Sequence, residues 1–168
     1  MQLPWAATQI AHWKHARVIG ADRSDKPSEA DAFVNTKNKD LPAEVKALTD
    51  GKGVDLVLDA VGGPMFESSL KSLRLGGRQV AITSVGDGRV EVNLVDFYHN
   101  CLRLLGVDTL KLAGSEIAKI MDDLRAGFED GHLRPPPVQT WTLDQGIDAY
   151  MAVEKGSASS KQILSPYE

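Results

Sequence analysis

The stretch Val54-Asp55-Leu56-Val57-Leu58-Asp59-Ala60-Val61-Gly62-Gly63-Pro64 decides the fold class of this chain. Its first eight residues are mostly apolar, which is typical of a parallel strand covered on both faces. The Gly-Gly-Pro that follows ends the strand, and an apolar stripe at helical spacing predicts a helix over 65–75. A second strand is predicted over 79–84, after Gly76-Gly77. Strand, helix and strand in this order indicate two parallel strands joined by a crossover helix.

The same alternation extends in both directions from this unit. Patterns of apolar residues, with proline near helix starts and glycine beyond helix ends, predict the other elements. Further strands are expected over 17–22, 32–34, 102–107 and 161–164, and further helices over 6–14, 41–50, 115–126 and 142–155. Strands that alternate with helices predict an α/β protein with a doubly wound parallel sheet.

Composition excludes several classes of protein. The 168 residues, 42% hydrophobic and 25% charged, suit one globular domain, with at most a small appendage. The net charge of −4 argues against nucleic-acid binding, and no apolar run approaches the roughly 18 residues that cross a membrane. A single cysteine, Cys101, excludes an internal disulfide or a thiolate zinc cluster. Without a signal peptide at its start, the chain is expected in the cytoplasm.

Five segments carry a resemblance to a known family. Gly53–Gly63 resembles the fourth strand of the nucleotide domain in medium-chain dehydrogenases/reductases. The other four follow in the family's order and spacing: Leu73–Arg78, Phe97–Gly106, Leu143–Gly156 and Ser160–Leu164. The resemblance covers nearly the whole chain from Ala6 onward, and it is closer to quinone oxidoreductases and zinc-type alcohol dehydrogenase-like proteins than to liver-type alcohol dehydrogenases.

The resemblance implies a fold and a function. Family members transfer a hydride between NAD(P)H and a carbonyl, alcohol, enone or quinone. Their Rossmann-like sheet has the strand order 3-2-1-4-5-6. Residues 1–134 would then form a truncated dinucleotide-binding domain. Residues 135–168 (an extended connector, a helix and a strand) would be the remnant of a catalytic domain whose larger part is not in this chain. We therefore expect an oxidoreductase-family protein that is inactive alone.

The family's first strand and Gly-rich turn have no counterpart here. Met1–Trp5 stands in their place, where Pro4 lacks an amide donor and Trp5 adds bulk. A dinucleotide site needs glycines there for close approach to the diphosphate, so we expect this cradle to be absent. Without strand 1, the strands at 17–22 and 54–61 would each expose an edge, and we expect another segment, a partner chain or a rearranged pairing to fill the gap. Between Asp22 and Phe33, the family's helix is expected to shorten to a polar loop.

Cofactor contacts are predicted at two places. Asp22 ends a strand where the family's carboxylate grips the adenosine ribose, which favours NAD, whereas Arg23 and Ser24 could receive the 2′-phosphate of NADP. The alternative is a solvated loop of mixed charge. The second place is the carboxyl ends of the later strands, where ligands bind in open α/β sheets. The residues expected there are Ala60, Val61, Gly62, Ile82, Thr83, Ser84, Val107 and Thr109. The alternative is ordinary turn geometry.

No catalytic residue and no zinc site are predicted. Tyr98 and His99 could transfer protons, but no base with an orienting partner stands near them in the sequence, so packing is the preferred interpretation. His12 and His15 lack a third ligand and are expected at the surface. Cys101 is interpreted as a small buried residue.

Two functional hypotheses remain open. The first is a truncated NAD(P)-dependent oxidoreductase; the second is a non-catalytic nucleotide-binding or assembly module. A methyltransferase is disfavoured because the family resemblance extends to the last strand. The expected partner is a second copy, paired through the edge strand Leu102–Val107, with strand exchange at the missing first strand as a further possibility. No nucleic-acid or membrane partner is expected.

Overall fold

Parallel strand pairing throughout the computed structural model, which describes residues 3–24, 29–155 and 160–167, confirms the predicted α/β class. Three parallel sheets have the orders β1-β2, β3-β4-β5 and β6-β7. The strands are β1 (Ile19–Asp22), β2 (Ala32–Asn35), β3 (Val54–Asp59), β4 (Leu73–Ala81), β5 (Arg103–Gly106), β6 (Val138–Thr142) and β7 (Lys161–Ser165). The helices are α1 (Leu3–Trp13), α2 (Leu41–Leu48), α3 (Phe66–Lys71), α4 (Leu94–His99), α5 (Gly114–Glu129) and α6 (Gly146–Glu154), with short 3-10 helices at Gly63–Met65, Thr109–Lys111 and Leu143–Gln145.

The main core lies where α3 covers the β3-β4-β5 sheet. Phe66, Leu70 and Leu73 are each at most 6% exposed and form its centre. Partly buried side chains of the sheet and of the region around α4 complete it: Val54, Val57, Val92, Phe97 and Leu102. Each fully buried side chain of this size contributes about 1.5–3 kcal/mol through the hydrophobic effect. This core holds β3 and β4 in place, and the candidate site lies at their ends.

The structure differs from the sequence prediction around α3. The helix ends at Lys71 instead of Leu75, and β4 begins at Leu73, which pairs with Val54 before a shift in register. Leu73 continues the apolar spacing of the helix, so the sequence pattern alone assigns it to α3. In the structure it is buried in the core as the first residue of β4. Residues 82–84, predicted as strand, lie beyond the end of β4.

Two elements were not predicted at all. Residues 138–141 were expected in the extended connector and Thr142 at the start of the last helix. They form β6, which pairs in parallel with β7 along its whole length. The indole Nε1 of Trp141 donates a hydrogen bond to Gln162 Oε1 at 2.6 Å across this pair. The other is α4, a short helix whose N-cap Asn93 accepts a hydrogen bond from the amide of Val95 at 2.9 Å.

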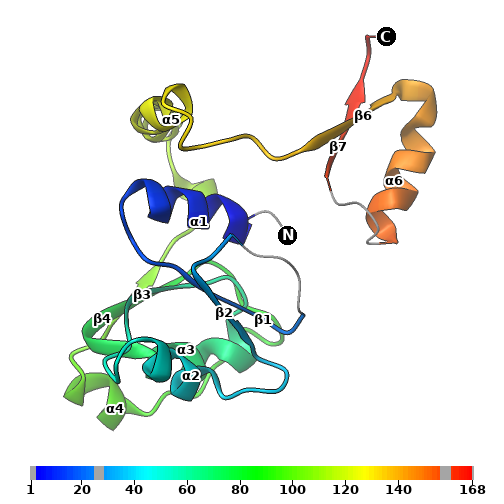
Figure 1. Ribbon diagram of the computed structural model, residues 1–168. Coiled ribbons are helices and arrows are strands. Elements are labelled where there is room, and N and C mark those ends of the chain that lie inside the picture. Colours follow the sequence, from blue (N-terminus) through cyan, green and yellow to red (C-terminus); the bar gives the residue numbers. More distant parts are fainter. Residues whose placement is uncertain (1–2, 25–28, 156–159, 168) are drawn as a thin grey trace.

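The unit β6-α6-β7 stands to one side of the other sheets, joined to α5 by an extended segment (Figure 1). This segment begins against α1 and α5. The amide of Arg134 donates a hydrogen bond to Gln9 Oε1 at 2.9 Å, and Leu133, only 5% exposed, packs closely against Gly127. The chain therefore leaves the main body at about residue 134.

β1 and β3 belong to separate sheets, and each has one strand neighbour. Within the described residues, no segment of the chain pairs with both of them, so the predicted rearranged pairing is not formed there. The predicted polar loop between Asp22 and Phe33 lies partly outside the described residues, as do Met1 and Gln2.

No helix in the described part of the chain combines the length and the apolar character that crossing a membrane requires.

Candidate nucleotide site at the carboxyl edge of the sheet

Three turns begin side by side at one edge of the β3-β4-β5 sheet. Asp59, the last residue of β3, pairs with Ala81, the last residue of β4, and Ala81 pairs with Gly106, the last residue of β5. Because the strands are parallel, the turns that follow them all leave from the same edge. We call residues 60–62, 82–84 and 107–109 at this edge the strand-end shelf.

Backbone hydrogen bonds tie the turns of the shelf to one another. The amide of Val85 donates to the carbonyl of Val61 at 3.0 Å, which joins the first turn to the second. The amide of Val107 donates to the carbonyl of Ala81 at 3.0 Å, which joins the third turn to the end of β4. The structure thus places the turns that contain Ala60, Val61, Gly62, Ile82, Thr83, Ser84 and Val107 at one edge of the sheet, and Thr109 begins the 3-10 helix that follows the third turn. Their contact with a cofactor stays a prediction.

Close contact between the first two turns depends on glycine. Gly62 has φ +62°, and a Cβ on it would lie 2.5 Å from the carbonyl oxygen of Thr83. Gly63 has φ +43°, and its Cβ would lie 2.6 Å from the carbonyl oxygen of Val85. Both the left-handed backbone and the lack of space exclude larger residues here. The glycines that end β3 therefore let its turn lie directly on the turn after β4.

Asp59 and Gln79 lie beneath the shelf and were missed among the site residues. They are 4% and 0% exposed. Gln79 Nε2 donates a hydrogen bond to Asp59 Oδ2 at 2.9 Å, and Asp59 Oδ1 accepts from the amides of Val61 and Gly62 at 3.0 and 2.7 Å. A carboxylate at the end of an otherwise apolar strand was the signal in the sequence that could have found Asp59.

Asp22, Arg23 and Ser24 lie at the end of β1, in a different sheet from the shelf. The amide and the hydroxyl of Ser24 each donate a hydrogen bond to Asp22 Oδ1 at 2.9 Å. Asp22 and Arg23 are exposed, so ligand access is open. The local turn already uses one carboxylate oxygen, and the ribose role of Asp22 stays a prediction.

The start of α1 fits a diphosphate poorly. The free amides of a helix's first turn are the groups that bind a phosphate, and Pro4, in that turn of α1, has none. Trp5 follows it and is half-buried. The described residues therefore fit the ends of a dinucleotide better than its centre.

The candidate proton-transfer residues, Tyr98 and His99, lie at the end of α4. The rings of Tyr98 and His99 meet edge to face at the end of α4, with centroids 4.6 Å apart, and Tyr98 is 60% exposed. Cys101 is exposed, so its predicted burial is wrong. The reason is that Cys101 lies in a tight turn with φ +50° before β5 begins, not in the strand.

The ring of His12 contacts the carboxylate of Asp31. Its Nε2 lies 3.1 Å from Asp31 Oδ2, which also accepts a hydrogen bond from the amide of Val18 at 2.7 Å. This amide, and then His12, hold the pKa of Asp31 below its ordinary value. Within the described ranges, no three histidine, cysteine, aspartate or glutamate side chains gather so that they could hold a metal ion.

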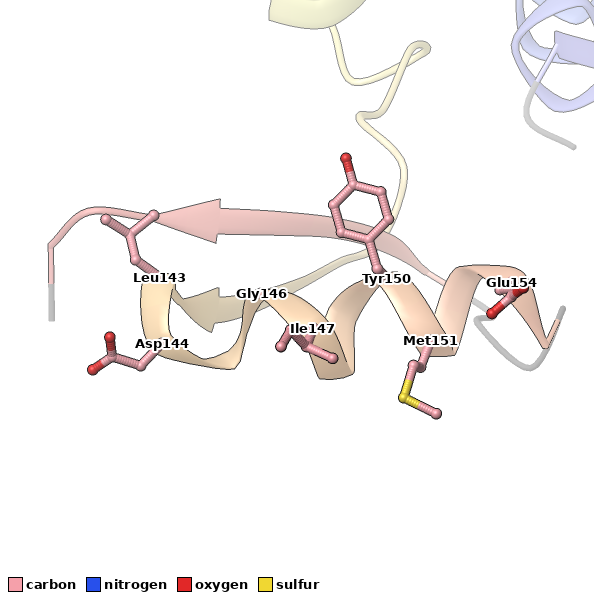
Figure 2. A pocket seen from close by; sticks show the side chains of 7 residues that line it. All are labelled: Leu143, Asp144, Gly146, Ile147, Tyr150, Met151 and Glu154. Atoms are coloured by element: carbon pink, nitrogen blue, oxygen red, sulfur yellow. The ribbon is translucent and has the colours of Figure 1, made fainter.

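A separate hollow of about 790 Å³ lies along α6. Figure 2 shows its side chains along the helix, with β6 and β7 behind it. Ile147 and Tyr150 are each 77% exposed, and the polar lining side chains are the acids Asp144 and Glu154. Polar groups do not converge there as they do under the shelf, so we assign the candidate site to the shelf.

Comparisons with known proteins agree with the fold. Residues 5–125 match the family model of zinc-binding dehydrogenases. The chain is 30% identical, over 95% of its length, to acryloyl-coenzyme A reductase of Sulfurisphaera tokodaii, and covers 46% of that protein. It resembles the structure of an NAD-dependent alcohol dehydrogenase, with 30% identity, a TM-score of 0.74 and coverage of 95% of this chain and 47% of the other. A mycobacterial quinone oxidoreductase shares the fold with a TM-score of 0.84 at 21% identity, covering 96% and 52%. The chain thus spans about half the length of these proteins.

Proposed function

Because this chain belongs to the zinc-binding dehydrogenase family, we propose that it is the nucleotide-binding part of an oxidoreductase that uses NAD or NADP. The observation that carries the proposal is the strand-end shelf, three turns joined at the carboxyl edge of one parallel sheet. This edge is where open α/β sheets bind nucleotides. The similarity to an NAD-dependent alcohol dehydrogenase supports the same cofactor class.

The residues suggest a division of roles along the cofactor. Asp22 would hold the adenosine ribose, Arg23 and Ser24 would meet a 2′-phosphate, and the shelf would receive the nicotinamide end. Pro4 in the first turn of α1 weakens the diphosphate contacts between these ends. We therefore propose weak binding, with a dissociation constant in the millimolar range for NAD or NADP.

Calorimetric titration of the chain with NAD, NADP and ADP-ribose tests this proposal. Asp22→Ala should abolish the weak binding, whereas Asp130→Ala, which removes an exposed carboxylate at the end of α5, should leave it unchanged. Micromolar binding would contradict the poor fit of the diphosphate. Complete absence of binding in the wild-type chain would contradict the nucleotide role itself and would favour the second function below.

We propose that the chain alone does not turn over substrates, since none of its described residues forms an acid–base pair at the shelf. The substrates of the whole protein would be carbonyl, enone or quinone compounds, as the names of its relatives suggest. The test is oxidation of NADH or NADPH in the presence of quinones and aldehydes. Measurable turnover would contradict the proposal. We further propose that the chain binds no zinc, and elemental analysis of the purified protein tests this.

A second candidate function is assembly. The edge strand β5 has one strand neighbour, β4, and all four of its residues are exposed. A second copy could pair with this edge through main-chain hydrogen bonds. Light scattering should then show a dimer, and Leu105→Lys, which places a charge on the edge, should shift it to monomer. Leu110→Lys, at a side chain already 91% exposed, is the control. A monomer up to millimolar concentration would contradict this proposal.

Among the described residues, β1 and β3 each have one strand neighbour, and this supports a further part of the proposal. A strand from another chain could enter between the two sheets, and exposed side chains on β3 such as Leu56 (43%) and Leu58 (37%) would gain cover. Crosslinking of chains that carry a single cysteine at position 56, in a Cys101→Ser background, tests this. Crosslinks that do not form would contradict strand exchange.

Residues 135–168 are proposed to belong to a second domain that other residues complete. The apolar face of α6 and the greater length of the relatives support this division. We propose a cytoplasmic location, because a chain with one cysteine needs no oxidising compartment for its folding.

A further inference from the structure

Burial of the polar pair Asp59 and Gln79 is unfavourable for the stability of the fold. Both side chains are at least nine-tenths buried, and burying polar groups is unfavourable unless hydrogen bonds compensate. Gln79 has its Nε2 bonded to Asp59 Oδ2, but its Oε1 is buried and accepts no hydrogen bond from the described residues. An apolar side chain would fill the same space without this cost. Within the described residues, the side chain of Gln79 makes one polar contact, the hydrogen bond to Asp59, and we take this contact to be its role.

Asp59 in turn holds the first turn of the shelf. Its Oδ1 accepts hydrogen bonds from the amides of Val61 and Gly62, while its Oδ2 accepts from Gln79. Hydrogen bonds to a carboxylate are stronger than neutral ones. The carboxylate thus connects three points: the end of β3, the turn that follows it, and the middle of β4.

The position of this turn decides the shape of the shelf. Gly62 lies against the backbone of Thr83 and Ser84, and Val61 is bonded to Val85, so a shift of the first turn would also move the second. Ligand-binding surfaces made of backbone need support from a second layer of side chains to keep their geometry. Asp59 and Gln79 are the buried polar side chains that supply this support beneath residues 60–62.

We propose that Asp59 and Gln79 are positioning residues of the nucleotide site: Asp59 holds the turn at 60–62 in its binding shape, and Gln79 orients the carboxylate of Asp59. This inference rests on the proposed function, because it takes the shelf as the surface that binds the ligand. Neither side chain need touch the ligand.

Two measurements on the full chain test the inference. The first is the affinity for NAD by calorimetry, and the second is hydrogen exchange of the Val61 and Gly62 amides by NMR. Asp59→Ala should weaken binding by about tenfold or more and speed exchange by a similar factor, since it removes two charge-assisted hydrogen bonds. Gln79→Leu leaves the hydrogen bonds of Asp59 Oδ1 to the turn in place, so it should weaken binding and speed exchange by a smaller factor. This variant tests the inference if Asp59→Ala does not fold.

Asp59→Asn is the conservative variant that separates positioning from folding. Its carbonyl oxygen can still accept from the two turn amides, and its amide group can donate to Gln79 Oε1 once the Gln79 amide rotates. Affinity and exchange should then lie between those of wild type and Asp59→Ala, because the hydrogen bonds that hold the turn are kept but are no longer charge-assisted. Leu133→Ala, which removes a buried side chain packed against Gly127 and outside the core of the β3-β4-β5 sheet, should leave both values unchanged while the protein stays folded.

The inference is overturned if Asp59→Asn loses as much affinity as Asp59→Ala, or if Leu133→Ala weakens binding as strongly. A wild-type chain that does not bind NAD would contradict the proposed function instead. In that case the exchange measurement still decides the positioning role, and unchanged exchange of the Val61 and Gly62 amides in Asp59→Ala would refute it.

Discussion

Gly62→Ala should destabilise the protein far more than glycine substitution elsewhere in the same region. Gly62 has φ +62° and ψ −149°, a conformation that is nearly restricted to glycine and costs another residue about 1–3 kcal/mol. The added Cβ would lie 2.5 Å from the carbonyl oxygen of Thr83 and 2.8 Å from Ser84 Cα. These are backbone atoms, so no side chain can move aside. Overpacking of this kind adds about 1–3 kcal/mol, and we expect a total loss of about 3–4 kcal/mol.

Gly86→Ala is the matched control. Gly86 has φ +83°, but a Cβ on it would meet nothing within 4 Å. Alanine at this position has the unfavourable left-handed backbone but no steric clash, so we expect the free energy of unfolding to fall by about 1 kcal/mol. Urea unfolding followed by circular dichroism measures both free energies of unfolding. Equal losses in the two variants would refute the reasoning, because the close approach of the two turns at the shelf would then contribute nothing.

Two further predictions concern the core and the acid range. Leu70→Ala should lower the free energy of unfolding by about 2–5 kcal/mol because Leu70 is 5% exposed at the centre of the core. Leu110→Ala, at a side chain 91% exposed, should change it by less than about 0.5 kcal/mol, and urea unfolding measures both. The amide of Val18 and the ring of His12 lower the pKa of Asp31, so its stabilisation is present above the ordinary value of 3.8 and is lost as pH falls through the lowered pKa. Asp31→Asn should therefore flatten the acid side of the stability profile, and an unchanged slope below pH 3.8 would contradict this.

Much of the fold was readable because it is encoded locally. α2 and α5 agree with their predicted ranges to within a few residues, since proline, glycine and apolar spacing act over short distances. The boundary at Leu73 was not readable, because its spacing fits both a helix and a strand. β6 was missed because three prolines precede it, and its strand conformation comes from pairing with β7, more than twenty positions away in the chain.

The site shows the same division. The sequence alone placed residues 60–62, 82–84 and 107–109 at the carboxyl ends of successive strands, because strand ends are marked by glycine and by the end of an apolar run. That β3, β4 and β5 end earlier, at Asp59, Ala81 and Gly106, came from the structure. Only the tertiary structure decided that Asp59 and Gln79 meet, since parallel pairing of β3 with β4 brings together side chains that are far apart in the sequence. A hydrogen bond between two buried polar groups depends on their distance in space, and the pattern along one strand has no information about the strand beside it.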